Sequence, residues 1–280
     1  MKQPLRLLAF IDGVSRNDLI DLCDDAVELT LIDNGSREQL LELISGYHGY
    51  IPTLRIPVDR KVLERGRQLR LIATPSTGTD HLDLPALAER GIAVQSLKEE
   101  RQLLAQLTST AELALGLMIT CARHLPQCFE ASRRGAWERS KLAGTQLSGK
   151  TLGIVGLGRL GAMMAKYGQA LGMKLLFCDP RPKSEVTGIE HATLDDLLQR
   201  ADVVSLHVHL TPETRHMLGR REFALIKPGA ILINTARGAL IDEAALIEAL
   251  RSGRLASAGL DVIDGEWRAD LENHPLIEYS

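Results

Sequence analysis

The sequence has few of the features that mark several classes of protein. Its four cysteines, in 280 residues, form no Cys-x-x-Cys pair and no metal-like spacing, so neither a disulfide scaffold nor a metal site is expected. Basic residues do not outnumber acidic ones, and the net charge of -3 provides no electrostatic footprint for nucleic acid. We therefore expect a cytoplasmic protein with reduced thiols, no metal and no nucleic-acid partner.

Long apolar runs are also scarce. The longest, Leu113 to Ala122, is shorter than the roughly 20 residues that cross a bilayer. The amino-terminal stretch has one early lysine and a short apolar run followed at once by polar residues, so we expect neither a signal peptide nor a membrane partner. What remains is an ordinary globular composition, 45% apolar and 25% charged, and a length that suits two domains.

One glycine-rich stretch organises the second half of the chain. Gly156, Gly158 and Gly161 have the G-x-G-x-x-G spacing between a short apolar run and a helical pattern. Such a turn lets backbone N–H groups approach a pyrophosphate at a helix N-terminus. The spacing alone also fits a plain strand turn. However, Asp179 ends the next apolar run about 20 residues on, where a carboxylate accepts both ribose hydroxyls and repels a 2′-phosphate. The stretch therefore predicts NAD rather than NADP.

Short apolar runs alternate with helical patterns along the whole chain, which predicts an α/β fold with two doubly wound parallel sheets. We expect a substrate domain, flavodoxin-like, at 1–99 and a Rossmann-type NAD-binding domain at 100–280. A helix over 109–133, apolar on nearly all faces, is expected between layers or in a homodimer interface. The expected strands are 5–11, 27–32, 49–54, 69–74, 92–95, 152–155, 174–178, 203–208, 231–235 and 258–262, and the expected N-caps include Thr193 and Asp242.

Residues that follow strands are the candidates for a site, because ligands of an open parallel sheet collect at the carboxyl ends of its strands. Arg237 suits a substrate carboxylate and its adjacent carbonyl, although a capping or interdomain arginine is a plainer interpretation. Glu266 suits the orientation of a histidine, or is a solvated loop residue. Arg55, and the small-residue loop that begins at Ser76, follow strands of the first domain. Arg55 taken alone also fits a solvated surface charge.

Five ordered motifs carry a family resemblance. The stretches STGTDHLD, WERSKLAGTQLSGKTLGIVGLGRLG, SLHVHLTPETRHML, LINTARGALIDEAALIEAL and GLDVIDGE resemble those of the D-2-hydroxyacid dehydrogenases, and look most similar to the 3-phosphoglycerate dehydrogenase type. The resemblance covers nearly the whole chain. It implies reversible hydride transfer between NAD and a small 2-hydroxy or 2-keto acid by a homodimer.

The resemblance also implies roles for individual residues. Arg237 matches the arginine that binds the substrate, Glu266 matches the glutamate that holds a catalytic histidine, and Asp261 matches a carboxylate near the nicotinamide. On the substrate side it implies Arg55, Ser76, Thr77, Gly78 and Arg237. On the cofactor side it implies Thr77, Gly156, Gly158, Arg159, Leu160, Gly161, Asp179, Val208, Thr235, Ala236, Arg237 and Asp261.

The sequence departs from the family pattern in two places. His209 stands where the family often has proline, so the adenine side of the site is expected to differ slightly. The family's catalytic histidine lies in a Thr-Pro-His segment beyond Glu266, and His274 is too close to Glu266 to match it. We therefore expect that histidine, and the return segment to the first domain, beyond Ser280, and poor turnover by these 280 residues alone. Two alternatives stay open: an NAD-sensing interaction protein, and a formate- or phosphite-type dehydrogenase.

Overall fold

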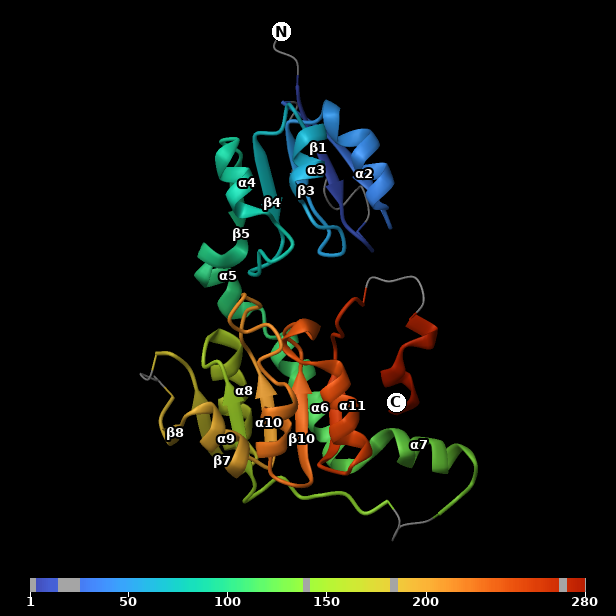
Figure 1. The fold of residues 1–280 in the computed structure, drawn as a ribbon, viewed down its shortest axis with the longest axis vertical. Coiled ribbons are helices and arrows are strands. Elements are labelled where there is room, and N and C mark those ends of the chain that lie inside the picture. The colour runs from blue at the N-terminus through green and yellow to red at the C-terminus, as the bar shows by residue number, and fades with distance from the viewer. Residues whose placement is uncertain (1–3, 15–25, 138–141, 182–185, 267–270, 280) are drawn as a thin grey trace. The chain divides into compact units, whose positions relative to one another are not determined.

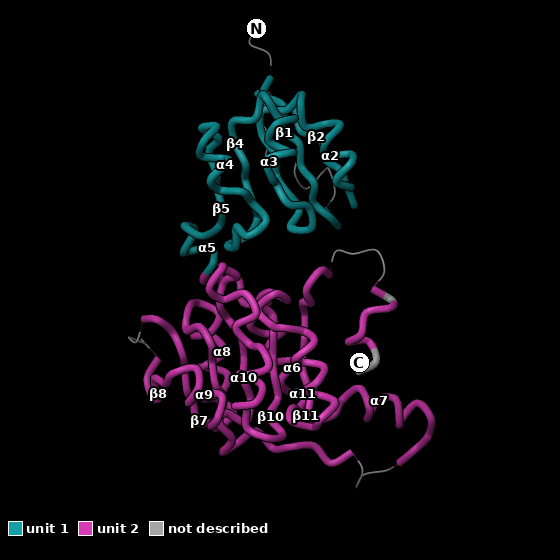
Figure 2. The backbone as a smooth tube through the Cα atoms, in the orientation of Figure 1, with its two compact units in different colours: residues 1–104 teal, residues 105–280 magenta. Residues whose placement is uncertain are grey.

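The computed structural model describes residues 4–14, 26–137, 142–181, 186–266 and 271–279. The chain divides into two compact units, Met1–Leu104 and Ala105–Ser280 (Figure 2), a division a few residues beyond the expected one. Cys23 lies outside the described residues, and the described cysteines are not in disulfides.

The first unit contains a five-stranded parallel sheet in the order β2-β1-β3-β4-β5. Its core gathers fully buried apolar side chains such as Phe10, Tyr50 and Ile72. Side chains cap the covering helices: the Ser36 hydroxyl accepts a hydrogen bond from the Gln39 N–H at 3.2 Å. The elements are β1 (Leu5–Phe10), β2 (Val27–Ile32), α2 (Arg37–Leu43), β3 (Gly49–Ile51), α3 (Arg60–Arg65), β4 (Leu71–Thr74), α4 (Leu84–Glu89), β5 (Ala93–Ser96) and, at the boundary, α5 (Arg101–Gln106).

The second unit contains a six-stranded parallel sheet (Figure 1) in the order β11-β10-β9-β6-β7-β8. Read from β8, this is the 3-2-1-4-5-6 order of a Rossmann fold, so the expected fold class is confirmed. The elements are α6 (Ser109–Arg123), α7 (Leu125–Arg133), β6 (Thr151–Val155), α8 (Arg159–Ala170), β7 (Lys174–Cys178), β8 (Ile189–His191), α9 (Leu194–Arg200), β9 (Val203–Leu206), α10 (Arg220–Leu225), β10 (Ala230–Asn234), α11 (Glu243–Arg251) and β11 (Leu255–Leu260).

Helices cover both faces of the second sheet. Leu152 and Ile154 of β6 pack with α6 and α8, whereas Val155 packs with the side chains of α9 to α11. The expected N-caps are confirmed, since the Thr193 hydroxyl accepts from the Asp196 N–H and the Asp242 carboxylate accepts from the Ala244 N–H. Burial on both faces explains why the central strands are mostly apolar.

The prediction of a single helix over 109–133 is wrong, because the structure has two helices there, α6 and α7. The chain breaks at His124, whose φ of 50° and ψ of 43° are left-handed, and α7 then begins with a proline in its first turn. Proline lacks an N–H and disfavours helical backbone in the residue before it, so Pro126 starts a new helix rather than continuing the old one. The apolar faces are not all covered either, since Leu113 of α6 is 42% exposed.

By length and composition alone, the helical stretch Arg101–Arg123 could cross a membrane. It is longer than the apolar run from Leu113 to Ala122 that the sequence shows. Core helices of globular proteins meet the same criterion. Within this stretch, α6 packs its Ala114, Met118 and Ala122 face against the sheet of the second unit.

Candidate functional site

The glycine turn after β6 is closed by steric contacts at two positions and open at the third. Gly156 has a φ of +91°, and a Cβ there would lie 2.6 Å from the His207 carbonyl oxygen. A Cβ on Gly161 would lie 2.1 Å from the Gly156 oxygen. A Cβ on Gly158, the N-cap of α8, would meet no atom within 4 Å. The turn thus leaves open space in front of the α8 N-terminus, which is where a diphosphate is stabilised.

Asp179 places a charged carboxylate beside this turn. Its Oδ2 atom accepts a hydrogen bond from the Leu157 N–H at 2.9 Å, and Oδ1 accepts from the Arg181 N–H at 2.8 Å. Burial opposes its ionisation, but these backbone donors and the charge of Arg181 outweigh burial and hold the pKa of Asp179 below its ordinary value. Oδ1 also accepts from Nε of Arg181 at 3.4 Å, so Oδ2 is the oxygen that keeps a further lone pair for a hydroxyl donor.

The turn after β10 is fixed by Asn234, a residue that the sequence analysis did not select. Asn234 is fully buried, its Nδ2 donates to the Arg237 oxygen at 2.9 Å, and its Oδ1 accepts from the Ala236 N–H at 3.0 Å. In the part of the chain that the structure describes, the neighbouring Thr235 hydroxyl is buried without a hydrogen-bond partner. A buried, unsatisfied hydroxyl is costly, and a polar ligand at this turn would satisfy it.

Arg237 and Glu266 lie on two loops that meet. A Cβ on Gly238 would lie 2.0 Å from the Ile263 carbonyl carbon, so only glycine fits where the loops touch. Arg237 donates from Nη1 to the Ala236 oxygen at 2.8 Å, and the Ile263 N–H donates to Glu266 at 3.1 Å. The pKa of Glu266 is raised above its ordinary value. Burial is the main cause, and the carboxylates of the same loop, including Asp261, add to it, whereas the charge of Arg237 opposes it.

Glu243, at the start of α11, braces the loop that carries Glu266. One carboxylate oxygen of Glu243 accepts from the Asp264 N–H at 2.7 Å, and the other lies 3.2 Å from Nε2 of His274. His274 therefore serves as a partner of Glu243. The sequence pattern does not single out Glu243, because an acidic residue in the first turn of a helix is common for local reasons.

The candidate residues of the first unit are held by side-chain contacts. Arg55 forms a bidentate ion pair with Asp12, in which Nη2 lies 2.7 Å from Oδ1. The Ser76 hydroxyl donates to the Gly78 oxygen at 2.6 Å and contacts Thr74, whose hydroxyl also lies 3.2 Å from His81. Thr77 is half-buried within the same loop.

The remaining candidates line the edge of the second sheet near the glycine turn. A Cβ on Gly156 would lie 2.7 Å from Val208, so that residue borders the turn. Arg159 and Leu160 open α8, and Arg159 donates from Nη1 to the Leu107 oxygen. Burial lowers the pKa of His207 to about 4, so this histidine is neutral at physiological pH and its ring contacts Ser205.

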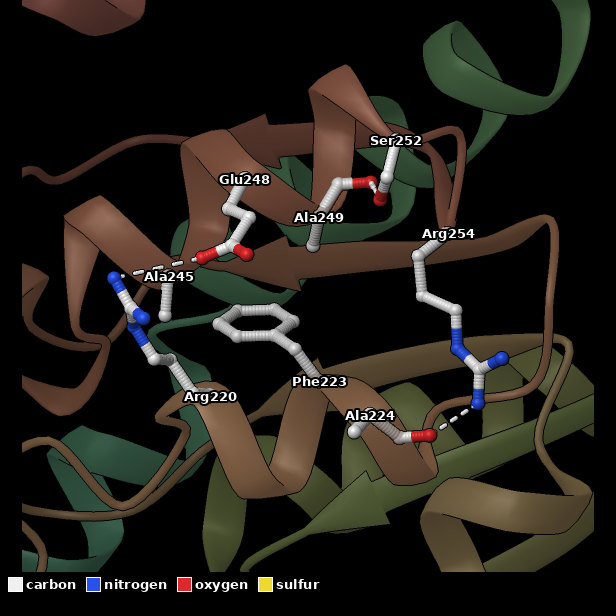
Figure 3. A pocket seen from close by; sticks show the side chains of 8 residues that line it. All are labelled: Arg220, Phe223, Ala224, Ala245, Glu248, Ala249, Ser252 and Arg254. Carbon is white, nitrogen blue, oxygen red and sulfur yellow. Dashed lines mark hydrogen bonds and ion pairs between the residues drawn. The ribbon is translucent and has the colours of Figure 1, made fainter.

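A cavity of about 300 Å³ lies elsewhere, between α10 and α11 (Figure 3). Phe223 and the alanines of α11 line it, and Arg220 and Arg254 flank it. It contains none of the predicted site residues, and Arg220 is already 3.6 Å from Glu248. Among the described residues, no group of His, Cys, Asp and Glu side chains is placed to hold a metal ion.

Comparison with known proteins agrees with this geometry. Residues 115–280 match the sequence profile of the family described as "D-isomer specific 2-hydroxyacid dehydrogenase, NAD binding domain". D-3-phosphoglycerate dehydrogenase of Methanocaldococcus jannaschii is 39% identical over 93% of this chain and 49% of its own length. Hydroxypyruvate reductase of Thermotoga maritima is 38% identical over 86% of this chain and 77% of its own.

The fold is also shared with solved structures. A crystal structure of a protein from Thermus thermophilus has a TM-score of 0.86 and 39% identity, covering 98% of this chain and 86% of that one. The chain spans about half the length of the phosphoglycerate dehydrogenases that it matches.

Proposed function

Since the chain belongs to the D-isomer-specific 2-hydroxyacid dehydrogenase family, we propose that it transfers a hydride between NAD and a small D-2-hydroxy acid or 2-keto acid. Its second unit is the NAD-binding domain of this family. Relatives named for 3-phosphoglycerate, hydroxypyruvate and glyoxylate support a substrate within that range.

The observation that carries this proposal is the fit of the second sheet edge to a dinucleotide. The open space at Gly158 suits a diphosphate, the Asp179 carboxylate suits ribose hydroxyls, and the unsatisfied Thr235 hydroxyl suits a polar group of the ligand. When bound there, NAD supplies the hydride chemistry through its nicotinamide ring.

The protein's own groups bind and orient the acid. We assign to Arg237 the substrate carboxylate and the adjacent carbonyl oxygen, because a guanidinium binds such groups through paired N–H donors. We assign to Glu266 the orientation of an imidazole that exchanges a proton with the carbonyl oxygen. Asp261 is assigned to the nicotinamide side, and Arg55 with the Ser76, Thr77 and Gly78 loop to the substrate side.

The test is NADH binding and NADH oxidation by the full-length protein, with hydroxypyruvate, glyoxylate and phosphohydroxypyruvate as acceptors. Arg237→Ala should lower turnover by about 100-fold or more, because it removes the substrate's charged partner. It should change the dissociation constant of NADH much less, because the other cofactor-side residues stay in place. Arg220→Ala, an arginine of the same unit beside the α10–α11 cavity, is the matched control and should alter neither. Bound NADH with no oxidation by any of these acids overturns the proposal.

We also propose a cytoplasmic homodimer that works without a nucleic-acid or membrane partner. The support for the dimer is the exposed apolar surface on α7 and just after it, where Phe129 is 63% and Trp137 is 76% exposed. The helix itself extends beyond the layers of its own unit (Figure 1). Sedimentation of the wild type as a dimer, and of Phe129→Asp as a monomer, is expected. A monomeric wild type at micromolar concentration contradicts the dimer.

A further inference from the structure

The guanidinium of Arg55 is held by one carboxylate at the carboxyl edge of the first sheet. Its Nε lies 3.0 Å from Oδ2 of Asp12 and its Nη2 lies 2.7 Å from Oδ1. Asp12 follows β1 and Arg55 follows β3, and these strands are neighbours in the sheet. The side chains are 38% and 29% exposed, so a ligand at this edge meets both members of the pair.

Asp12 is itself fixed by the neighbouring strand end. The Asn34 N–H donates to Oδ1 of Asp12 at 3.0 Å, and the Gly13 N–H donates to the carboxylate of Asp33 at 3.2 Å. The two loops after β1 and β2 are therefore joined by reciprocal contacts. This cluster of Asp12, Asp33 and Arg55 brings two carboxylates and one guanidinium together, so its own formal charge is −1.

This arrangement changes what Arg55 can bind. A guanidinium binds a phosphate through the same fork of paired N–H donors that it presents to a carboxylate. Here two of those donors are already engaged by Asp12. A phosphate dianion has to displace Asp12 or lie beside its charge, and like charges in contact are strongly unfavourable. A neutral hydroxymethyl group meets no such repulsion, and its hydroxyl can donate to a free lone pair of Asp12.

We propose that Asp12 is a specificity-determining residue that restricts the substrate to short 2-hydroxy or 2-keto acids without a phosphate group. The inference rests on the proposed function, in which Arg55 belongs to the substrate side. Asp12 acts by engaging Arg55 and by adding a negative charge beside its guanidinium.

The experiment compares two acids that differ by the phosphate. The dissociation constants of D-glycerate and 3-phospho-D-glycerate are measured by calorimetry on the full-length, NAD-saturated protein. The wild type should bind glycerate more tightly. Asp12→Asn keeps the acceptor for the Asn34 N–H and removes the charge, so it should shift the ratio of the two constants toward phosphoglycerate by about tenfold. Adding Arg55→Gln to this variant should cancel the shift.

The matched control is Asp59→Asn. Asp59 forms an ion pair of the same kind with Arg37, at 2.6 Å and with side chains 45% and 31% exposed, and asparagine preserves its N-cap role on α3. This variant should leave the ratio unchanged. If Asp12→Asn does not fold, Asp33→Asn removes a charge from the same cluster and should shift the ratio in the same direction by a smaller factor.

The outcomes separate the two proposals. Binding of both acids with the same ratio in wild type and Asp12→Asn, or a wild type that prefers phosphoglycerate, overturns the role of Asp12 and leaves the dehydrogenase intact. Binding of NAD with neither acid overturns the proposed function, and the role of Asp12 with it.

Discussion

The two sheets present their carboxyl edges in different ways. At the first edge, charged side chains engage each other, as Arg55 does with Asp12. At the second edge, the loops are fixed by close main-chain packing and by side chains that bind backbone groups, namely Asn234, Asp179 and Glu243. The Thr235 hydroxyl is left unsatisfied in the described structure and the space at Gly158 is open. A surface built on backbone packing has its shape set before a ligand arrives, whereas ion pairs can be exchanged for ligand contacts. The first edge is therefore expected to tune specificity, and the second to provide affinity.

The largest effect should come from breaking the backbone packing of the second edge. Gly161→Ala places a Cβ against the Gly156 oxygen, where no side chain can yield. We expect a loss of about 1–3 kcal/mol in the free energy of unfolding, typical of overpacking, and of about 100-fold or more in NADH affinity. Urea unfolding and a fluorescence titration measure the two effects.

Two other glycines serve as controls. Gly158→Ala meets no atom, so it should leave the NAD-free protein as stable as the wild type while lowering NADH affinity. Gly116→Ala, inside α6 and also in open space, should raise stability by roughly 0.5–1 kcal/mol through helix propensity. Equal behaviour of Gly161→Ala and Gly158→Ala would contradict a turn closed at one position and open at the other.

The next largest effect is expected from Asp179→Asn, because Asp179 carries a charge and accepts hydrogen bonds from two backbone N–H groups. Asp179→Asn should shift the ratio of NADH to NADPH affinity toward NADPH by about tenfold. The native pKa of Asp179 is lowered, so its ionised form stabilises the fold above the ordinary pKa of an aspartate. That contribution is lost as the pH falls through the native value. The stability difference from the wild type should thus be full at pH 5 and shrink below about pH 4.

Asp202→Asn is the matched control for this prediction. Asp202 also accepts a backbone N–H, from Thr151 at 2.8 Å, and pairs with Lys227, and its pKa is lowered against the opposing effect of burial. It precedes β9, however, at the amino edge of the sheet. Its variant should lose stability with a similar pH dependence but keep the nucleotide preference, and a change in that preference would show that the effect of Asp179 is not local.

The sequence predicted the parts of this molecule that local patterns decide. The bounds of β2 and β7 match the expected runs, and in both cases the run ends directly before an aspartate, Asp33 or Asp179. β8 was missed because Ile189 is its one apolar residue. The helix break at His124 follows from Pro126, a signal that was available but was outweighed by the apolar pattern around it.

The candidate site was likewise predicted only in part. Glycine spacing and strand ends located Gly156, Asp179 and Arg237 at one sheet edge. Two residues that hold this edge in shape were not foreseen. Asn234, whose contacts are local, lies in a run that predicts only a buried strand, whereas Glu243 was missed because its contact with Asp264 joins residues 21 positions apart. The pairing of Asp12 with Arg55 escaped for the same reason: 43 residues separate them, and only the order of the strands brings them together.

Thr235 tests whether the second edge is incomplete without its ligand. Thr235→Val keeps the shape of the side chain and removes a buried hydroxyl that lacks a partner in the described structure. The NAD-free protein should become more stable, by about 1 kcal/mol, and NADH should bind several-fold more weakly. Melting temperatures with and without NADH measure both. A variant that is less stable without NADH would mean that the hydroxyl is already satisfied.

The smallest expected effect is the loss in the free energy of unfolding when the Asp12–Arg55 ion pair of the first edge is removed. A double-mutant cycle of Asp12→Asn and Arg55→Gln should give a coupling of about 0.2–1 kcal/mol, as for other partly exposed pairs. Salt should reduce it, because the Debye length at 1 M is only about 3 Å. Urea unfolding of the four proteins at low and high salt measures the coupling. A coupling of several kcal/mol that resists salt would make the pair a structural anchor, and the distinction between an exchangeable first edge and a fixed second edge would fail.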